Sequence, residues 1–327
     1  MAAPTGSAAA FAGMIDLASE ALGGVALVAN DEFFAGKENL LKPGRGILDP
    51  DRFVPTGKWT DGWESRRRRQ PGHDWCVIKL GLPGVIRGVD VDTNHFLGNA
   101  PSYISVDGAN SAEGPWTEIV PRGPIAPGSQ NLFGSTSTNA WSHVRLNMYP
   151  DGGIARFRVY GEVSVKPKAG EVLDLAALTN GGRAVACSDM FFSSMTNLIM
   201  PGRGVHMGDG WETKRRRGPG HDWAIIQLAA PGRISKLEID TRHFMGNYPD
   251  TASVDALYAP GQLVDALTWF NFEWKEILPR QKTQADTQHV FEKEVKDIGP
   301  VSHVRLNIHP DGGVKRFRVY GRIDDRP

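Results

Sequence analysis

The sequence predicts an all-β protein made of two tandem jelly-roll β-sandwich domains that arose from an internal duplication. The second half of the chain repeats the motifs of the first half in the same order, which indicates two copies of one domain. Most segments are also of strand length, rich in β-branched and aromatic residues, and bounded by glycine, proline, asparagine or aspartate. This second pattern is typical of antiparallel sheets joined by turns.

The repeat extends over nearly the whole chain. Residues 17–24, "LASEALGG", correspond to residues 175–182, "LAALTNGG", and "SHVRLNMYPDGGIARFRVYG" returns as "SHVRLNIHPDGGVKRFRVYG" near the C-terminus. Two inserts interrupt the match: about ten residues around "ILDPDRFVPT" in the first copy, and a segment around "YAPGQLVDALTWF" in the second. A period this long marks a tandem duplication and not a solenoid.

The repeat divides the 327 residues into four parts. We expect an N-terminal lead-in at residues 1–15, a first β-sandwich repeat at 16–163, a linker at 164–173 and a second β-sandwich repeat at 174–327. The boundary stretch "VSVKPKAGEV" is rich in proline, glycine and lysine, which suits an exposed connection. The lead-in lacks the basic start of a secretory signal.

Individual elements follow from local patterns. Strands are expected in the first copy at "WCVIKL", "GVDVDT", "WTEIV", "HVRLNMY" and "RFRVYG". In the last of these, Phe157 and Val159 alternate with arginine and tyrosine, as in a half-buried strand. "YPDGG" and "HPDGG" each join two strands, and their glycines suit a tight hairpin. The best helix candidates are residues 4–23 and 173–178.

Composition narrows the class of function. Lys+Arg and Asp+Glu both number 37, and this neutral balance argues against a nucleic-acid partner. No apolar run approaches the roughly 18 residues of a membrane span, so no membrane partner is expected. The chain has only two cysteines, Cys76 and Cys187, in different contexts, so no disulfide framework is indicated and a reducing, cytoplasmic setting is expected. Each aligns with an alanine in the other copy, which indicates inert thiols.

A run of arginines is the most conspicuous motif. "DGWESRRRRQPGHDW" occupies residues 61–75, and "DGWETKRRRGPGHDW" occupies residues 209–223. In an extended run, Arg67 and Arg69 face one way and Arg68 the other. Arginine suits a two-pronged grip on a carboxylate. The alternative is a solvated loop whose arginines pair with neighbouring acids.

Polar residues cluster in two further motifs. "DTNHFLGN" begins at Asp92 and directly follows a predicted strand, where a rigid sheet often presents functional side chains. Asp92 and His95 are candidates for an acid–base or metal pair, and His73 of "GHDW" for proton transfer or a structural role. The spacing of Asp92 and His95 fits no standard zinc-binding motif, so no cofactor is expected. A weakly bound divalent ion is kept as an alternative. Glu64 is a candidate base or an ion-pair partner of the arginines.

These motifs, with "HVRLNMYPDGG" and all the second copies, resemble the allantoicase (allantoate amidinohydrolase) family. The resemblance covers about residues 16–321. It implies a duplicated jelly-roll, galactose-binding-like architecture and a hydrolase of carbon–nitrogen bonds other than peptide bonds. The implied reaction is the hydrolysis of allantoate to ureidoglycolate and urea in purine (allantoin) degradation, and the implied assembly is a homo-oligomer.

The resemblance implies roles for the candidate residues. Allantoate carries a carboxylate and two ureido arms on one carbon, so its cleavage needs an anion-binding group, an acid for the departing urea and a base for water. The candidate catalytic residues are the acids His95 and His243 and the bases Asp92, Asp240, Glu64 and Glu212. The candidate substrate-binding residues are Arg67, Arg69, Arg215, Arg217, Asn99, Asn247, His73 and His221. Whether each copy has its own site stays open.

Two other classes of function are kept as alternatives. Tandem jelly rolls also serve as non-catalytic modules that bind a small polar or sugar ligand, and the fold alone does not separate them from enzymes. The arginine run and its neighbouring tryptophans also suit single-stranded nucleic acid, but the neutral net charge weakens this reading.

Overall fold

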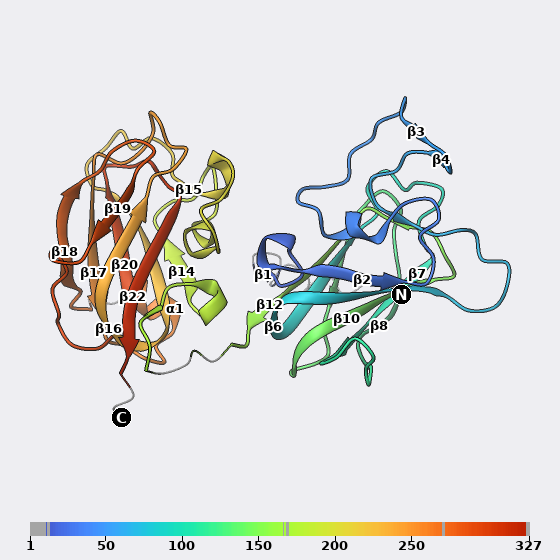
Figure 1. Cartoon of the computed structure of the whole chain (residues 1–327), viewed down its shortest axis with the longest axis horizontal. Coiled ribbons are helices and arrows are strands. Elements are labelled where there is room, and N and C mark those ends of the chain that lie inside the picture. The colour runs from blue at the N-terminus through green and yellow to red at the C-terminus, as the bar shows by residue number, and fades with distance from the viewer. Residues whose placement is uncertain (1–10, 12–13, 166, 168–169, 270–271, 325–327) are drawn as a thin grey trace. The chain divides into compact units, whose positions relative to one another are not determined.

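The computed structural model describes residues 11, 14–165, 167, 170–269 and 272–324. The chain divides between Ser164 and Val165 into two compact units, and each unit holds one copy of the repeat (Figure 1). Nearly all regular structure in the described residues is β-strand, so the predicted all-β class with two jelly-roll repeats is confirmed.

The described residues of the first unit form twelve strands and two 3-10 helices. The strands are β1 (Ile15–Asp16), β2 (Val25–Ala29), β3 (Phe53–Val54), β4 (Gly57–Lys58), β5 (Trp63–Glu64), β6 (Asp74–Asp92), β7 (Tyr103–Ala109), β8 (Thr117–Pro124), β9 (Gln130–Gly134), β10 (Ala140–Tyr149), β11 (Gly153–Ile154) and β12 (Arg156–Val163). The 3-10 helices are η2 (Glu20–Leu22) and η3 (Lys37–Leu41).

The long strand β6 joins the two layers of the first unit. Its first half pairs with β2 and β10, and β10 continues the layer through β7 to β8. Its second half pairs with β9 and β12, and β12 pairs with β1. Apolar side chains from both halves, such as Ile78 and Val91, are fully buried. The segments "WCVIKL" and "GVDVDT", predicted as two strands, are therefore parts of one.

The second unit repeats this topology around β16. Its strands are β13 (Leu173–Asp174), β14 (Arg183–Cys187), β15 (Trp211–Glu212), β16 (Asp222–Asp240), β17 (Thr251–Leu257), β18 (Lys275–Lys282), β19 (Gln288–Phe291), β20 (Val301–His309), β21 (Gly313–Val314) and β22 (Arg316–Ile323). Its helices are η4 (Leu178–Asn180), η5 (Met195–Ile199), η6 (Met207–Asp209) and α1 (Val264–Trp269).

The predicted hairpin at "YPDGG" is wrong. Strands β10 and β12 do not pair with each other, because each pairs with β6. Between them, β11 pairs with β5 and so ties Glu64 to Gly153. A side chain at Gly152, whose φ is 147°, would meet the backbone oxygen of Asn99 at 2.6 Å. The glycine thus serves a close approach between two loops.

The two helix predictions are also wrong for the described residues. In residues 4–23, of which 4–10 and 12–13 lie outside the described part, the chain forms β1 and η2. Residues 173–178 form β13 and the start of η4. The Asp16 carboxylate accepts a hydrogen bond from the Val159 amide, so pairing with β12 overrides local helix propensity. The α-helix α1 lies instead in the insert of the second repeat.

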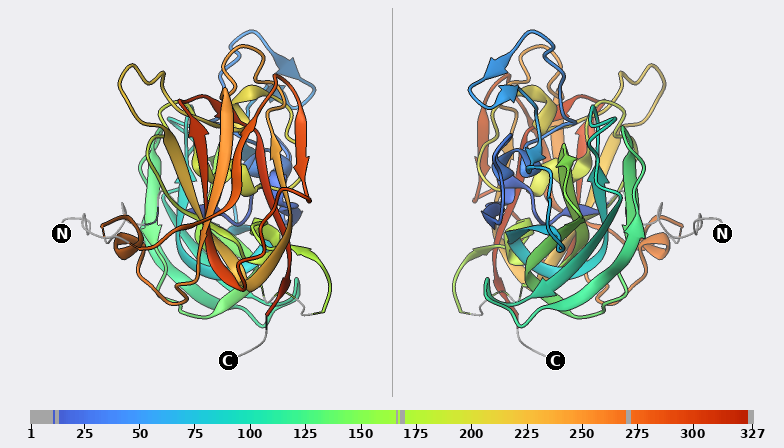
Figure 2. Two further views of the ribbon diagram at one scale, coloured as in Figure 1. Left: turned by 90° about the vertical axis from the view of Figure 1, so that its left-hand side faces the viewer. Right: turned by 90° about the vertical axis from the view of Figure 1, so that its right-hand side faces the viewer.

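The two inserts build different local structures. In the second repeat, Leu267 of α1 packs with Ile225 and Leu257 in a small apolar cluster. In the first repeat, the insert forms the β3–β4 hairpin, which projects from the first unit beyond its long strands (Figures 1 and 2). The first-repeat insert therefore lies at the end of the unit where the loops that follow β2, β5 and β6 gather, which is called the loop end below.

Both cysteines are free thiols, and Cys76 is fully buried. Burial raises the pKa of Cys187 to about 11, and burial also raises the pKa of Cys76. Both thiols therefore stay protonated at neutral pH and are poor nucleophiles. No helix in the described part of the chain is long and apolar enough to cross a membrane.

Stability is expected to fall on acidification because of His303. This residue on β20 is 1% exposed, its ring nitrogen lies 2.9 Å from the Ser302 hydroxyl, and burial lowers its pKa to about 4. In the unfolded chain the pKa returns to about 6.5, so the unfolded state binds the proton more tightly. The free energy of unfolding therefore falls as pH drops from about 6.5 to about 4.

The check is urea unfolding of the parent and of His303→Gln at neutral and mildly acidic pH. The substitution is expected to weaken the acid-induced loss of stability. The matched control is His143→Gln, the equivalent change in the first repeat, where the ring is only partly buried and a smaller effect is expected. An unchanged pH dependence in His303→Gln would contradict the role of this buried ring.

Candidate functional site

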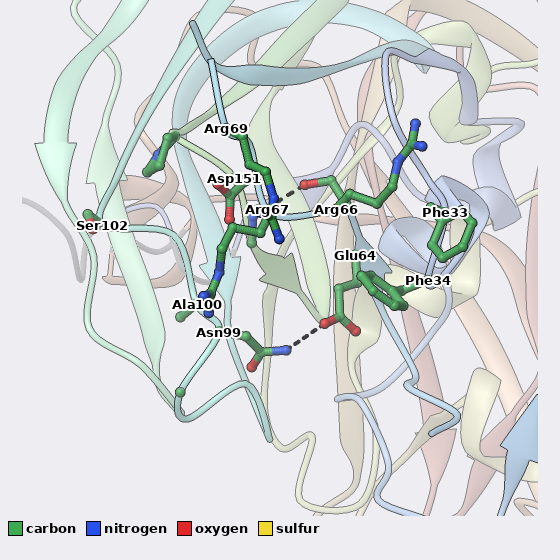
Figure 3. Close-up of a pocket in the computed structure, with 14 residues that line it drawn as sticks. Phe33, Phe34, Glu64, Arg66, Arg67, Arg69, Asn99, Ala100, Ser102 and Asp151 are labelled. Carbon is green, nitrogen blue, oxygen red and sulfur yellow. Dashed lines mark hydrogen bonds between the residues drawn. The ribbon is translucent and has the colours of Figure 1, made fainter. Parts of the chain in front are cut away.

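A cavity of about 580 Å³ opens among loops of the first unit. Figure 3 draws its lining, which comes from four segments: the chain after β2, the stretch after β5, the loop before β7 and the turn after β10. The lining residues are Phe33, Phe34, Glu64, Ser65, Arg66, Arg67, Arg69, Gly98, Asn99, Ala100, Ser102, Pro150, Asp151 and Gly152. Loops held by rigid strands are a common place for binding and catalytic groups.

Glu64 and Asn99 form the polar centre of this cavity. The Asn99 side-chain amide donates a hydrogen bond of 2.7 Å to one Glu64 carboxylate oxygen (Figure 3). The backbone of Glu64 is fixed on both sides, by pairing with Gly153 and by a bridge to Ala35. Since its amide nitrogen faces Glu64, Asn99 can offer its carbonyl oxygen to a ligand N–H group.

The arginine run follows the predicted alternation only in part: Arg66, Arg67 and Arg69 line the cavity and Arg68 does not, but all four line a neighbouring hollow of about 570 Å³. Arg68 turns away from the cavity and forms a 2.9 Å ion pair with the buried Asp74, and Arg66 pairs with Asp31 at 2.7 Å. Arg67 and Arg69 line the cavity, and neither forms an ion pair with any residue that the structure describes. Their guanidinium groups lie across the cavity from Phe33 and Phe34 (Figure 3). These two arginines are thus available to an anionic ligand.

His95 lines a second cavity of about 340 Å³ that shares Phe34, Glu64 and Asn99 with the first. The first-repeat insert and the residues that follow it, including Trp59, supply much of its other wall. The backbone of His95 has φ of 69°, a left-handed conformation that non-glycine residues seldom adopt. Such strain is often found at functional sites, and His243 of the second repeat shares it with φ of 70°.

Asp92 lies apart from both cavities. Its side chain is buried, and its two oxygens accept hydrogen bonds of 2.8 and 2.9 Å from Arg45. Asp240 of the second repeat is held in the same way by Arg203. Sequence reasoning missed these arginines because they lie far from the aspartates along the chain. The arrangement favours a structural role for both aspartates.

Replacing Asp92 with asparagine is expected to lower the free energy of unfolding by about 1–3 kcal/mol. The loss is moderate because the Arg45 side chain is 49% exposed and can be solvated. Turnover per folded molecule should stay close to that of the parent, and Asp240→Asn should behave alike. Urea unfolding and initial rates measure both quantities; normal stability with lost turnover would make Asp92 the base.

His73 packs against the sheet instead of facing either cavity. Its ring nitrogen lies 3.3 Å from the Asn147 amide oxygen, and its ring is 4.5 Å from that of Tyr149. Burial lowers the pKa of His73, and the contact with Asn147 raises it by a smaller amount. His221 makes the corresponding contact with Asn307 at 3.2 Å. These contacts favour the structural reading of both histidines.

The second repeat keeps the polar pair and has methionine beside it. Asn247 donates to Glu212 at 2.6 Å, and the same amide lies 3.6 Å from the Met207 sulfur. Arg215 and Arg217 line a hollow of about 320 Å³ that also contains Asp189 and Asp222. Its equivalent in the first repeat, a hollow of about 570 Å³, is lined by the whole arginine run together with Asp31 and Asp74. The short segment that carries Met207 stands where the first repeat has its insert.

Three further lining residues were not among the predicted site residues: Phe34, Trp59 and Thr60. Trp59 and Thr60 directly follow the insert and align with Met207 and Gly208, so the repeat gives them no signal, whereas Phe34 recurs as Phe192 but carries no polar group. No group of three histidine, cysteine or acidic side chains suited to a metal ion occurs in the part of the chain that the structure describes.

Fold and site together define a duplicated jelly-roll protein whose loops bring a carboxylate–amide pair into one cavity with two arginines that have no ion-pair partner among the described residues. The family model of the allantoicase repeat matches residues 15–164 and again residues 173–324. The chain belongs to the allantoicase family.

Individual relatives agree over the full length. Probable allantoicase 1 of Burkholderia mallei is 49% identical over 319 residues, which cover 95% of each chain. A probable allantoicase of Pseudomonas aeruginosa is 46% identical and covers 96% of this chain and 97% of its own. The crystal structure of allantoicase from Saccharomyces cerevisiae superposes with a TM-score of 0.78 at 40% identity, covering 94% of this chain and 92% of that one.

Proposed function

We propose that the chain hydrolyses allantoate to ureidoglycolate and urea in purine degradation, and that the reaction takes place in the loop-end cavity of the first repeat. One observation carries the assignment of the site. Two arginines without an ion-pair partner among the described residues share a cavity with a hydrogen-bonded carboxylate–amide pair. This set matches a ligand that has one carboxylate and ureido N–H and C=O groups.

The reaction exchanges one bond at the central carbon. Water gives a proton to a base and its oxygen bonds to the carbon, while the bond from that carbon to one ureido nitrogen breaks. The departing nitrogen takes a proton from an acid and leaves as urea. A positioned acid and base each contribute to such a step when they reach the transferring proton.

The roles follow from the placement of the side chains. Arg67 and Arg69 bind the carboxylate, and Asn99 accepts from a ureido N–H. Glu64 is the base, because it lines both cavities, whereas Asp92 is occupied by Arg45. His95 supplies the proton to the leaving nitrogen from the adjoining cavity.

The experiment is to incubate the purified protein with allantoate and to quantify both products. Urea and ureidoglycolate are expected in equal amounts. Ligand binding without product release would instead indicate a non-catalytic binding module. Salt-sensitive binding of single-stranded DNA, with no urea release, would point to nucleic acid.

We also propose a cytoplasmic homo-oligomer, as the family resemblance implies. Light scattering of the full chain in solution tests the assembly, and a mass equal to one chain would contradict it. Cell fractionation tests the location.

A further inference from the structure

The base proposed above is held by a residue that only the first repeat has. The Thr60 hydroxyl donates a hydrogen bond of 3.0 Å to the Glu64 carboxylate oxygen that Asn99 does not bind. The two oxygens of Glu64 are therefore held by two different segments, one by the residue that precedes Asp61 and one by the loop before β7. Two such contacts restrict the carboxylate to one orientation and one rotamer.

The second repeat lacks this tether. Gly208 stands at the position of Thr60 and has no side chain to donate. Among the residues that the structure describes, Glu212 accepts a side-chain hydrogen bond from Asn247 on one oxygen only. The Asn247 amide is moreover shared with the Met207 sulfur. The equivalent carboxylate is thus held at one point instead of two.

We propose that Thr60 is a positioning residue that fixes the Glu64 carboxylate for proton abstraction, and that its absence makes the second repeat the weaker catalyst. The inference rests on the proposed function, since it assigns Glu64 the role of base. A carboxylate fixed by two donors spends more time in the geometry that abstracts a proton from water. Loss of one donor should lower kcat more than substrate affinity.

The insert does not depend on the Thr60 hydroxyl for its own shape. Phe53 pairs with Lys58 across the β3–β4 hairpin, and the Trp59 amide donates to the Arg52 carbonyl at 3.0 Å. The Arg52 guanidinium lies 4.4 Å from the centre of the Trp59 ring. Replacing threonine by the isosteric valine should therefore leave the hairpin folded.

The experiment compares Thr60→Val and Thr60→Ser with the parent, using allantoate as substrate. Removal of the hydroxyl is expected to lower kcat by about 10- to 100-fold, the range for a hydrogen bond to a charged group. KM should change little, and serine, which keeps the hydroxyl, should restore most of kcat. Unchanged kcat in Thr60→Val would overturn the inference.

A double-substitution cycle separates positioning from a structural effect. Once Glu64→Gln has removed the base, Thr60→Val should cause little further loss, so the two effects should not add. Full additivity, or a loss of kcat in Thr60→Val that serine does not restore, would overturn the role of Thr60. No urea release by the parent would overturn the proposed function and this inference together, whereas normal turnover in both parent and Thr60→Val would overturn this inference alone.

Discussion

Glu64→Gln is expected to lower kcat for allantoate by about 10²- to 10⁴-fold, the usual contribution of a general base. Glutamine keeps the size of the side chain and a hydrogen-bonding oxygen, but it does not take up a proton from water. The Asn99 and Thr60 contacts hold the side chain in place in the parent. KM should therefore change far less than kcat, which steady-state urea release will show.

The matched change in the second repeat is Glu212→Gln. It removes a carboxylate with the same amide partner, yet one without the hydroxyl tether. Most of the parent's kcat is expected to remain. An equal loss in both variants would mean that both repeats contribute, and a loss in Glu212→Gln alone would move the working site to the second repeat.

Replacing Arg67 and Arg69 together with glutamine should weaken substrate binding strongly. Each charge-assisted hydrogen bond contributes about 1.5–3 kcal/mol, and both guanidinium groups lack another ion-pair partner among the residues that the structure describes. The substrate carboxylate is unchanged by the reaction. Losing its contact with the arginines therefore weakens binding of the ground state and of the transition state equally. KM should rise by about 10²-fold or more while kcat stays closer to the parent.

Two controls sharpen this prediction. The double lysine variant keeps the charge but loses the planar two-pronged grip, so an intermediate KM is expected. Arg87→Gln removes an exposed arginine that pairs with Glu162 instead of lining the cavity, and normal kinetics are expected. An unchanged KM in the double glutamine variant would show that the carboxylate binds elsewhere.

The sequence predicted the duplicated all-β architecture because the repeat and the strand-like segments are local signals. Local signals do not show which distant strands pair. The two segments of β6 look like separate strands, since the glycines and proline between them resemble turn residues, but continuous pairing with β10 and β12 keeps the backbone extended. Likewise, the turn at Gly152 resembles a hairpin until β11 pairs with β5.

The candidate site could be predicted in part. Alternation along an extended run predicted that Arg67 and Arg69 face one way and Arg68 the other, and only Arg68 of these three is missing from the cavity lining. All three arginines nevertheless line a neighbouring hollow, because long side chains reach beyond their own face. The partner of Asp92 could not be found, since Arg45 comes near only through the fold. Thr60 could not be found either, because glycine stands at the equivalent position of the second copy, so the comparison of the two copies does not mark it.

The most direct test of the account is a crystal structure of the Glu64→Gln variant with allantoate bound. The account predicts the substrate carboxylate on Arg67 and Arg69 and a ureido arm beside Asn99 in the first repeat. Allantoate seated on the sheet face near His73, or in the second repeat alone, would contradict it.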